Sequence, residues 1–336
     1  MAFLDYVIKR MALFVLVIIG VVTVTFLLSH VIPADPVGAI LGENAPQELV
    51  KKTEKLLGLD LPLHQQYIRY VKGMLYWDFG IALRTQNPVS QDLKTYFPAT
   101  LELVILSMLI AITCGIGVGI LSAVKRNKLP DNISRIFSLI GISMPAFWLG
   151  LLVILILYYH LSIIPPGGRL SPHISPPLTV TGLYTIDSLV AGEFRTFLDA
   201  LYHLLGPGLV LGWIQTAYIC RVTRSSMLEV FNEEYIRTAR VKGLKERIVI
   251  FRHAFKNAAI PVITMVGISF GYLLEGSVLT ETVFGYPGLG RYSVNSFLSL
   301  DLNAVVGSVT LIAMCYALSN LVVDLLYGYL DPRVKY

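Results

Sequence analysis

The 336-residue sequence has few charged residues and few cysteines. Only 15% of its residues are charged, against 55% that are hydrophobic, and the mean hydropathy is +0.67. This composition excludes an ordinary soluble domain. The three cysteines, Cys114, Cys220 and Cys315, are an odd number and lie in or beside apolar runs, so neither a disulfide framework nor a metal cluster is expected.

Short motifs of enzymes are also missing or out of context. There is no Gly-Lys dipeptide, so the chain lacks a Walker A loop for the phosphates of ATP. No His-Glu-x-x-His or paired-cysteine metal site occurs. The stretch GISFG, with Ser269, fits a hydrolase pattern that requires a strand-to-helix turn, but it lies in an apolar run. We predict no catalytic residue, no metal ligand and no cofactor bound by this chain.

Long apolar runs are what the sequence has instead. A helix needs about 20 apolar residues to cross a bilayer core of about 30 Å, and six runs qualify. The first run is longer than a signal-peptide core and no small-residue cleavage site follows it, so we expect it to remain as an anchor. The predicted spans are 11–31, 100–124, 136–159, a short and weak one at 204–220, 258–278 and 304–327.

The loops between these runs predict the orientation. Most Lys and Arg residues precede the first span, follow the last, or lie between the second and third or the fourth and fifth spans. By the positive-inside bias, these segments and both termini are cytoplasmic, in a multi-pass protein of the cell membrane. The basic loops account for the isoelectric point near 9.0, so no nucleic-acid partner is expected.

The sequence therefore predicts an all-α integral membrane protein with six transmembrane helices. Its parts are a tail and first span (1–32), an extracytoplasmic loop (33–98), a membrane domain (99–330) and a cytoplasmic tail (331–336). The membrane domain includes a second extracytoplasmic loop (161–203) and a cytoplasmic loop (228–257). Helical patterns occur in the first loop at 47–57 and 63–75.

The most charged cytoplasmic segment, EEYIRTARVKGLKERIVIFRHAFKNAAIP, begins at Glu233. Asn232 is a candidate N-cap, acids in the first turn favour a helix start, and Gly243 is a stop signal. A second helix is predicted over 244–257, leading into the fifth span. A basic loop on anionic lipid is one interpretation. A docking element for a protein partner is the other interpretation. It is favoured by the apolar residues Tyr235, Ile236, Ala239, Leu244, Val249 and Phe251.

This segment closely resembles the coupling loop, or EAA loop, of binding-protein-dependent ABC importer permeases of the dipeptide/oligopeptide/nickel branch. The likeness covers almost the whole chain and implies a MetI-like permease fold with an extracytoplasmic insert after the first helix. The stretches that carry it are IPADP, LGLDLPLHQQYIRY, FGIALRTQNPV, FPATLEL, SMPAFWLGLL, EEYIRTARVKGL, FRHAFKNAAIP, VFGYPGLGR and LVVDLLYGYLDPRVKY. The chain departs from the generic EAA pattern at Arg237, where a glutamate is usual, and in the longer spacing from Gly243 to Pro261.

The resemblance implies a transporter subunit that works with several partners. These are a second similar permease, two cytoplasmic ATPases that bind ATP and Mg, an extracytoplasmic binding protein and the lipid bilayer. Di- or oligopeptides are the implied cargo, with oligosaccharides or nickel complexes as the alternative. A secondary transporter is an alternative from another class, but no internal repeat supports it. The residues implied to couple to the ATPases are Glu234, Tyr235, Arg237, Thr238, Ala239, Arg240, Lys242, Gly243 and Leu244.

Three acids within the spans need an explanation, because ionisable groups are costly in a membrane. For Glu102 and Asp324, which lie near interfaces, we favour local capping or helix pairing over a place in the pathway. Glu275 precedes a glycine-rich turn, and the sequence makes it a candidate for the pathway or an outer gate. The turn adds three further candidates for the same role, Tyr286, Pro287 and Gly288.

Small residues and prolines within the spans have a structural interpretation. The pairs Gly115 and Gly119, and Gly267 and Gly271, are each one turn apart, which predicts close helix packing. Pro145 and Pro207 are predicted to bend the third and fourth spans, with hinges for alternating access as a further interpretation.

Overall fold

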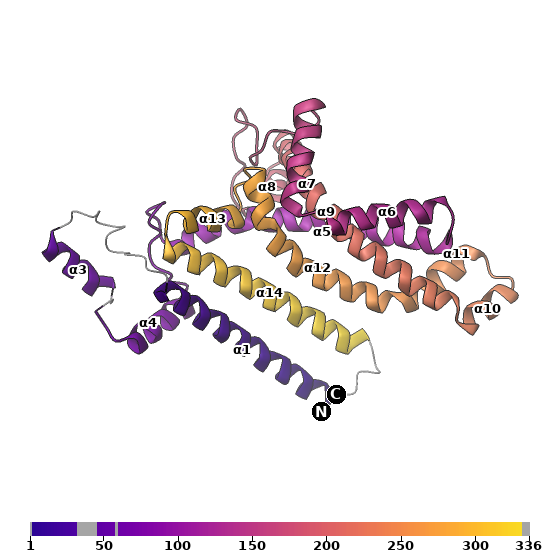
Figure 1. The fold of residues 1–336 in the computed structure, drawn as a ribbon, viewed down its shortest axis with the longest axis horizontal. Helices are drawn as coiled ribbons and strands as arrows, with labels where there is room; N and C mark the ends of the chain where they lie inside the picture. The colour runs from indigo at the N-terminus through magenta and orange to yellow at the C-terminus, as the bar shows by residue number, and fades with distance from the viewer. Residues whose placement is uncertain (1, 32–45, 58–59, 331–336) are drawn as a thin grey trace.

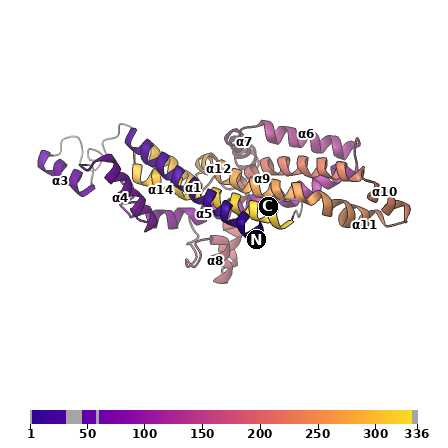
Figure 2. The same cartoon turned by 90° about the horizontal axis from the view of Figure 1, so that it is seen from below.

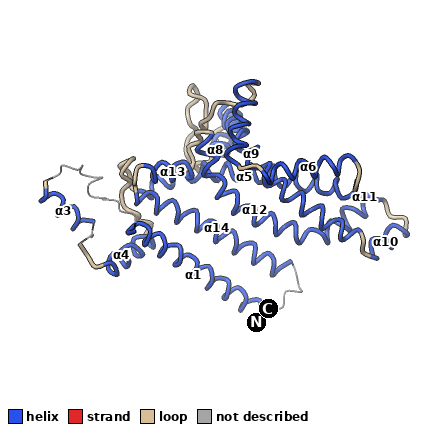
Figure 3. Tube along the Cα trace, in the orientation of Figure 1, coloured by secondary structure: helices blue, strands red, loops and turns tan. Residues whose placement is uncertain are grey.

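This computed structural model describes residues 2–31, 46–57 and 60–330, and these fold almost entirely as helices (Figure 3). Within these ranges there is no β-strand, and five helices are long and apolar enough to cross a membrane. The all-helical prediction is therefore confirmed. The five are α1 (Ala2–Val31), α5 (Val89–Val124), α9 (Phe194–Phe231), α12 (Lys256–Val283) and α14 (Leu302–Leu330).

The third predicted span is broken rather than straight. α6 (Leu129–Ser143) and α7 (Ala146–Val153), which a π-helical stretch (Ile154–His160) continues, meet at a bend of 110°. Pro145 lies at the break, where the bend was predicted, because proline lacks an amide hydrogen and disfavours helical geometry before it. Pro207 instead lies inside α9, which continues on both sides of it.

The fourth predicted span, 204–220, is wrong in length, because α9 has 38 residues. α9 lies at the centre of the bundle and packs against α5, α6, α8 (Tyr184–Val190) and α12. Its polar side chains Gln215, Thr216 and Thr223 are buried. These side chains face protein rather than lipid, so a spanning helix here needs less hydrophobicity than its neighbours.

The paired glycines bring helices into close contact, as predicted. A β-carbon built at Gly115 or Gly119 would lie 2.8 or 2.6 Å from a side chain of α9. Gly267 and Gly271 meet side chains of α14 in the same way. Small residues at these positions let α5 approach α9, and α12 approach α14, at short distance.

The helices outside the spans gather at opposite ends of the bundle (Figures 1 and 2). One end carries α3 (Gln47–Leu57) and α4 (Leu63–Leu75), which agree with the helices predicted for the first loop. The other end carries α10 (Glu234–Val241) and α11 (Glu246–Ile248). The predicted tail 331–336 and the start of the predicted extracytoplasmic loop, 33–45, lie outside the described residues.

α1 runs along α14 (Figure 1), and the two helices are joined by an ion pair. Arg10 Nη1 lies 2.7 Å from Asp324 Oδ2. The prediction that Asp324 pairs between helices is confirmed.

Candidate functional site

α10 is a short helix with well-defined ends. It starts after Glu233, whose backbone is extended, rather than after the predicted N-cap Asn232. That prediction is wrong because α9 runs farther than expected and Asn232 ends it, donating from Nδ2 to the Leu228 carbonyl oxygen at 3.0 Å. The predicted stop at Gly243 is confirmed, since this residue has φ +74°, in the left-handed region that glycine favours.

One face of α10 is part of an apolar core. Ile236 is fully buried and Ala239 is 6% exposed. They belong to a cluster in which α5, α9 and the start of α12 meet beneath α10. Its other buried members are Ile120, Ala123, Met227, Val249, Ala254 and Ala258. α10 is therefore packed onto the ends of three spanning helices.

The opposite face of α10 is open. Apart from Ala239, every residue predicted to couple to a partner is exposed: Glu234, Tyr235, Arg237, Thr238, Arg240, Lys242, Gly243 and Leu244. The sequence interpretation missed Val241, which is 83% exposed. Nearby, Arg247, Ile248, Phe251 and Arg252 line a shallow pocket. The open face thus combines apolar side chains with positive charge.

Polar contacts tie α10 to its neighbours. Arg240 Nη2 lies 2.7 Å from Glu246 Oε1 on α11, and its guanidinium lies 5.4 Å from the ring centroid of Phe231 on α9. Asn257 Nδ2, on α12, donates to the Tyr235 hydroxyl at 2.8 Å. α10 is connected in this way to helices on both sides of it.

The second helix predicted after α10 is confirmed and continues into the membrane. α11, a π-helical stretch (Val249–Phe255) and α12 together form one 38-residue candidate span from Glu246 to Val283. The segment that follows α10 therefore continues without a break into a spanning helix.

A buried ion pair on the same side of the bundle was not predicted. Asp131, on α6, is fully buried and accepts hydrogen bonds from Arg224 Nε (2.7 Å) and Nη2 (2.9 Å) on α9. Ser122 Oγ and the Asn127 amide donate to the same carboxylate at 2.6 and 2.8 Å. The turn between α5 and α6 is thereby fixed to α9. In the sequence these residues look like ordinary charges of a basic loop.

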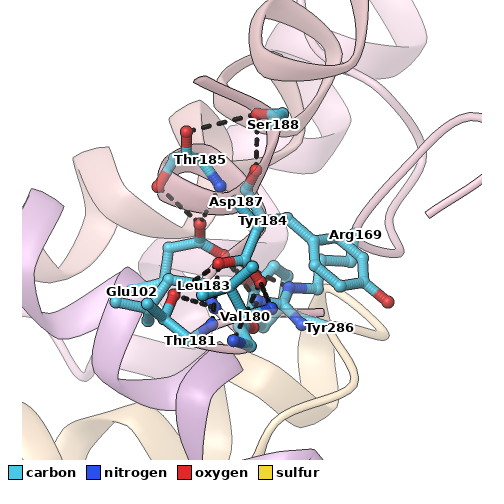
Figure 4. Close-up of polar contacts among 11 residues, drawn as sticks. Glu102, Arg169, Val180, Thr181, Leu183, Tyr184, Thr185, Asp187, Ser188 and Tyr286 are labelled. Carbon is cyan, nitrogen blue, oxygen red and sulfur yellow. Dashed lines mark hydrogen bonds and ion pairs between the residues drawn. The ribbon is translucent and has the colours of Figure 1, made fainter. Parts of the chain in front are cut away.

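At the other end of the bundle, Glu102 on α5 is the centre of a second buried network (Figure 4). Arg169 donates to Glu102 Oε2 from Nη2 at 2.9 Å and from Nε at 3.2 Å. The amide and hydroxyl of Thr185 each donate to Oε1 at 2.6 Å, and the Tyr286 hydroxyl lies 3.4 Å from Oε2. The prediction that Glu102 takes part in local pairing is confirmed.

The loop that supplies Arg169 has its own carboxylate anchor (Figure 4). Asp187, on α8, accepts hydrogen bonds from the amides of Val180 (3.2 Å), Thr181 (2.8 Å) and Gly182 (2.9 Å). Burial by itself raises the pKa of Asp187, but the hydrogen bonds from Thr181 and the other donors outweigh it and hold the pKa below its ordinary value. The charged carboxylate thus fixes the loop.

Another buried carboxylate, Glu281, lies near the C-terminal end of α12. It accepts hydrogen bonds from Thr100 Oγ1 on α5 (2.5 Å) and from the Arg291 amide on α13, Leu289–Leu298 (3.0 Å). A β-carbon at Gly288 would overlap the carboxylate. Gly288 is therefore required because the backbone approaches Glu281 closely.

The residues predicted for a pathway or outer gate occupy different environments. Tyr286 is fully buried and Gly288 is buried, whereas Pro287 is partly exposed. Burial raises the pKa of Tyr286, because it disfavours the phenolate. Glu275 is exposed on α12 and has no hydrogen bond or ion pair with the residues that the structure describes. A gate role stays a prediction for all four.

The hydrolase-like stretch GISFG lacks the geometry that its catalytic motif requires. Ser269 is buried inside α12 rather than on a strand-to-helix turn, so the hydrolase pattern is incidental. Among the described residues, no group of three or more His, Cys, Asp or Glu side chains is placed to hold a metal ion.

These features define a multi-pass helical membrane protein with a short, partly exposed helix, α10, at one end. Comparison with known proteins gives the family. A model described as "Binding-protein-dependent transport system inner membrane component" matches residues 115–336. The model for the N-terminal part of such components matches residues 3–104. The chain belongs to this family, and the predicted resemblance is confirmed.

Similar proteins match the chain over almost its full length. The probable D,D-dipeptide transport system permease protein DdpB of Escherichia coli (strain K12) is 47% identical over 95% of this chain and 94% of the relative. The dipeptide permease DppB of Alkalihalophilus pseudofirmus is 43% identical over 99% and 100%. The glutathione permease GsiC of Salmonella paratyphi A is 37% identical over 99% of each chain.

Proposed function

We propose that this chain is one of two similar permease subunits that together form the pathway of an ABC importer for short peptides. An extracytoplasmic binding protein delivers the cargo to the end that carries α3 and α4. Two ATPases dock at the end that carries α10, which is cytoplasmic together with both termini. ATP and Mg are bound by the ATPases, and this chain takes no cofactor.

The observation that carries the proposal is the construction of α10. Its buried face is packed on α5, α9 and α12, and its other face presents Tyr235, Val241 and Leu244 at 41, 83 and 38% exposure. A partner that binds the open face and moves would carry α12 with it. ATP-driven closure of the ATPases is converted in this way into rearrangement of the spanning helices.

The names of the relatives favour peptides as cargo. The similar proteins include permeases of dipeptide, di/tripeptide, D,D-dipeptide and glutathione transport systems. Free peptides share an ammonium and a carboxylate group, whereas oligosaccharides and nickel complexes do not share this pair of groups. We therefore place peptides ahead of these two alternatives.

Glu275 is our candidate for the wall of the pathway. At about 1.5 Å per residue, it lies about 12 Å along α12 from the outer end at Val283. A charged side chain at this depth faces a protein interior or a water-filled cavity rather than lipid. Because Glu275 has no partner among the described residues, the exposed side of α12 faces the second permease or the pathway between the two.

Uptake by the reconstituted complex tests the cargo. Proteoliposomes that contain both permeases and both ATPases, with the loaded binding protein outside, should accumulate labelled dialanine only with ATP and Mg inside. An ATPase variant without its Walker A lysine is the control. Accumulation of an oligosaccharide or a nickel complex, with no competition from dialanine, would contradict the peptide assignment.

Labelling tests the position of Glu275. In the complex, a Glu275→Cys variant should react with a water-soluble thiol reagent, and cargo transport should slow the reaction. Leu279→Cys lies on the same exposed side of α12. Its reaction with the same reagent shows how far along α12 the water-accessible surface extends. Labelling by a lipid-soluble reagent alone would contradict a place on the pathway.

A further inference from the structure

α4 lies beside the membrane-embedded part of α1. The hydroxyls of Thr23 and Tyr67 are 2.7 Å apart, and the Phe26 ring lies 5.2 Å from that of Tyr67 and 5.5 Å from that of Tyr70. Thr23 and Phe26 belong to the apolar window Val7–Leu27 that qualifies α1 as a span. α4 is therefore level with the end of this apolar window that is far from the N-terminus, and Figure 1 shows it beside that end of α1.

The apolar face of α4 is wider than α1 can cover. At about 3.6 residues per turn, one side of the helix carries the apolar residues, and His64 lies among them. The apolar residues are Leu63, Tyr67, Ile68, Tyr70, Val71, Met74 and Leu75. The tyrosines contact α1, but Leu63, Ile68 and Leu75 are 61, 51 and 76% exposed. Gln65, Arg69 and Lys72 lie on the opposite side. An apolar strip next to α1 is left open.

Two exposed aromatic residues extend this strip. Tyr76 and Trp77, which follow α4, are 84 and 47% exposed. Trp77 has φ 57°, a conformation that is rare for a bulky residue. Hydrogen bonds hold the turn, since the Trp77 amide donates to the Met74 carbonyl at 3.0 Å and the Asp78 amide donates to that of Gly73 at 2.8 Å. The backbone that carries Trp77 is thus fixed at the end of α4, and the indole lies 5.9 Å, centroid to centroid, from the Phe79 ring.

We propose that α4 and the turn at Tyr76 and Trp77 form a lipid-binding face. Its ligands are phospholipids of the outer leaflet, bound through the glycerol region and the upper part of the acyl chains. Lipid is favoured over a protein partner because the strip continues the lipid-facing surface of a spanning helix. Trp and Tyr are also enriched at membrane interfaces, and amphipathic helices lie in that plane. The site anchors the outer half of α1 independently of transport.

Lipid quenching of Trp77 fluorescence tests this proposal in the assembled transporter. The protein is reconstituted into vesicles of phosphatidylcholine and phosphatidylglycerol that carry a nitroxide either near the glycerol or near the acyl-chain end. The contribution of Trp77 is the difference between wild type and Trp77→Phe. Interfacial helices bury only about 5–10 Å, so the shallow label should quench this contribution at least about twofold more strongly than the deep label.

A pair of further variants distinguishes loss of lipid contact at the strip from a general effect of a new charge on folding. Leu75→Glu should reduce quenching by the shallow label, whereas Leu178→Glu, at a residue 79% exposed in the second extracytoplasmic loop, should leave it unchanged. Quenching of Trp77 by aqueous iodide but not by labelled lipid would overturn the proposal. Protection of Trp77 from both quenchers would also overturn it, because the second permease or another protein would then cover the strip.

Discussion

Three carboxylates at the end of the bundle that we propose is outer, and the charged residues of α10 at the other end, have opposite surroundings. At the outer end, the carboxylates of Glu102, Asp187 and Glu281 are at most 4% exposed, and each accepts hydrogen bonds from within the chain. On α10, at the other end, the charged residues are exposed, and the Arg240 and Glu246 side chains of its ion pair are 44 and 54% exposed. These three carboxylates find their donors within the chain, while α10 leaves an open surface.

This difference suggests a division of labour. A buried carboxylate is tolerated only when donors surround it, so each outer network fixes several segments relative to one another. The inner end is also fixed beneath its surface, because Asp131 and Arg224 join the α5–α6 turn to α9. The outward side of α10, by contrast, is exposed. We infer a rigid frame that presents this side of α10 to a partner.

The largest effect on stability is expected from Arg169→Met. Removing one partner of a buried ion pair costs about 3–5 kcal/mol, because the remaining charge of Glu102 stays buried without its partner. Thermal unfolding of the purified complex measures the loss. Arg240→Met is the matched control at the other end, where an exposed pair contributes about 0–1 kcal/mol. Equal losses in the two variants would contradict the comparison.

A smaller loss is expected from Gly288→Ala. The new methyl group overlaps the Glu281 carboxylate, and overpacking of a buried site costs about 1–3 kcal/mol. The same unfolding assay measures it. Gly243→Ala provides the contrast, because no atom lies within 4 Å of the added carbon and only the left-handed backbone opposes it, by about 1–2 kcal/mol. Gly243→Ala should leave the hydrogen-bond networks of Glu102, Asp187 and Glu281 unchanged. A weakened Glu102 network in this variant would show that the two ends of the bundle are not independent.

The smallest effect is expected from Asp187→Asn, which weakens the hydrogen bonds to the loop amides by about 1 kcal/mol. Faster hydrogen exchange at Val180, Thr181 and Gly182 is the readout. Because folding lowers the pKa of Asp187, its stabilisation is complete above the ordinary value of 3.8 and is lost as the pH falls through the lowered value. In Asp187→Asn, this loss of stability at acidic pH should be absent. If stability still falls in the same pH range, another group is responsible.

Sequence patterns predicted the fold where local signals and composition decide it. The apolar runs, the helices α3 and α4, the Gly243 stop and the bend at Pro145 all follow from periodicity or from backbone chemistry. The length of α9 could not be predicted in this way, because its polar residues are compatible with the membrane only once α5, α6 and α12 surround them.

Only part of the candidate site could be predicted, because some of its contacts join segments that are far apart in the sequence. The sequence interpretation assigned Ile236 and Ala239 to a face for a protein partner, whereas both side chains are buried against other helices of this chain. The partners of Glu102 and Glu281 come from segments far away in the sequence, such as the loop with Arg169, so no local pattern pairs them. Glu275 attracted attention as an acid within a span, whereas Glu281, six positions later, forms the buried network.

Co-purification of the ATPases with a Val241→Asp variant tests the central claim most directly. Val241 is 83% exposed, so the substitution leaves the packing of α10 intact and places a charge on its open face. Leu178→Asp, at an equally exposed residue of the outer end, is the control. The account predicts that Val241→Asp loses the ATPases while the two permeases stay together, and that Leu178→Asp keeps them. Full retention of the ATPases by Val241→Asp, or their absence from the wild type, would contradict it.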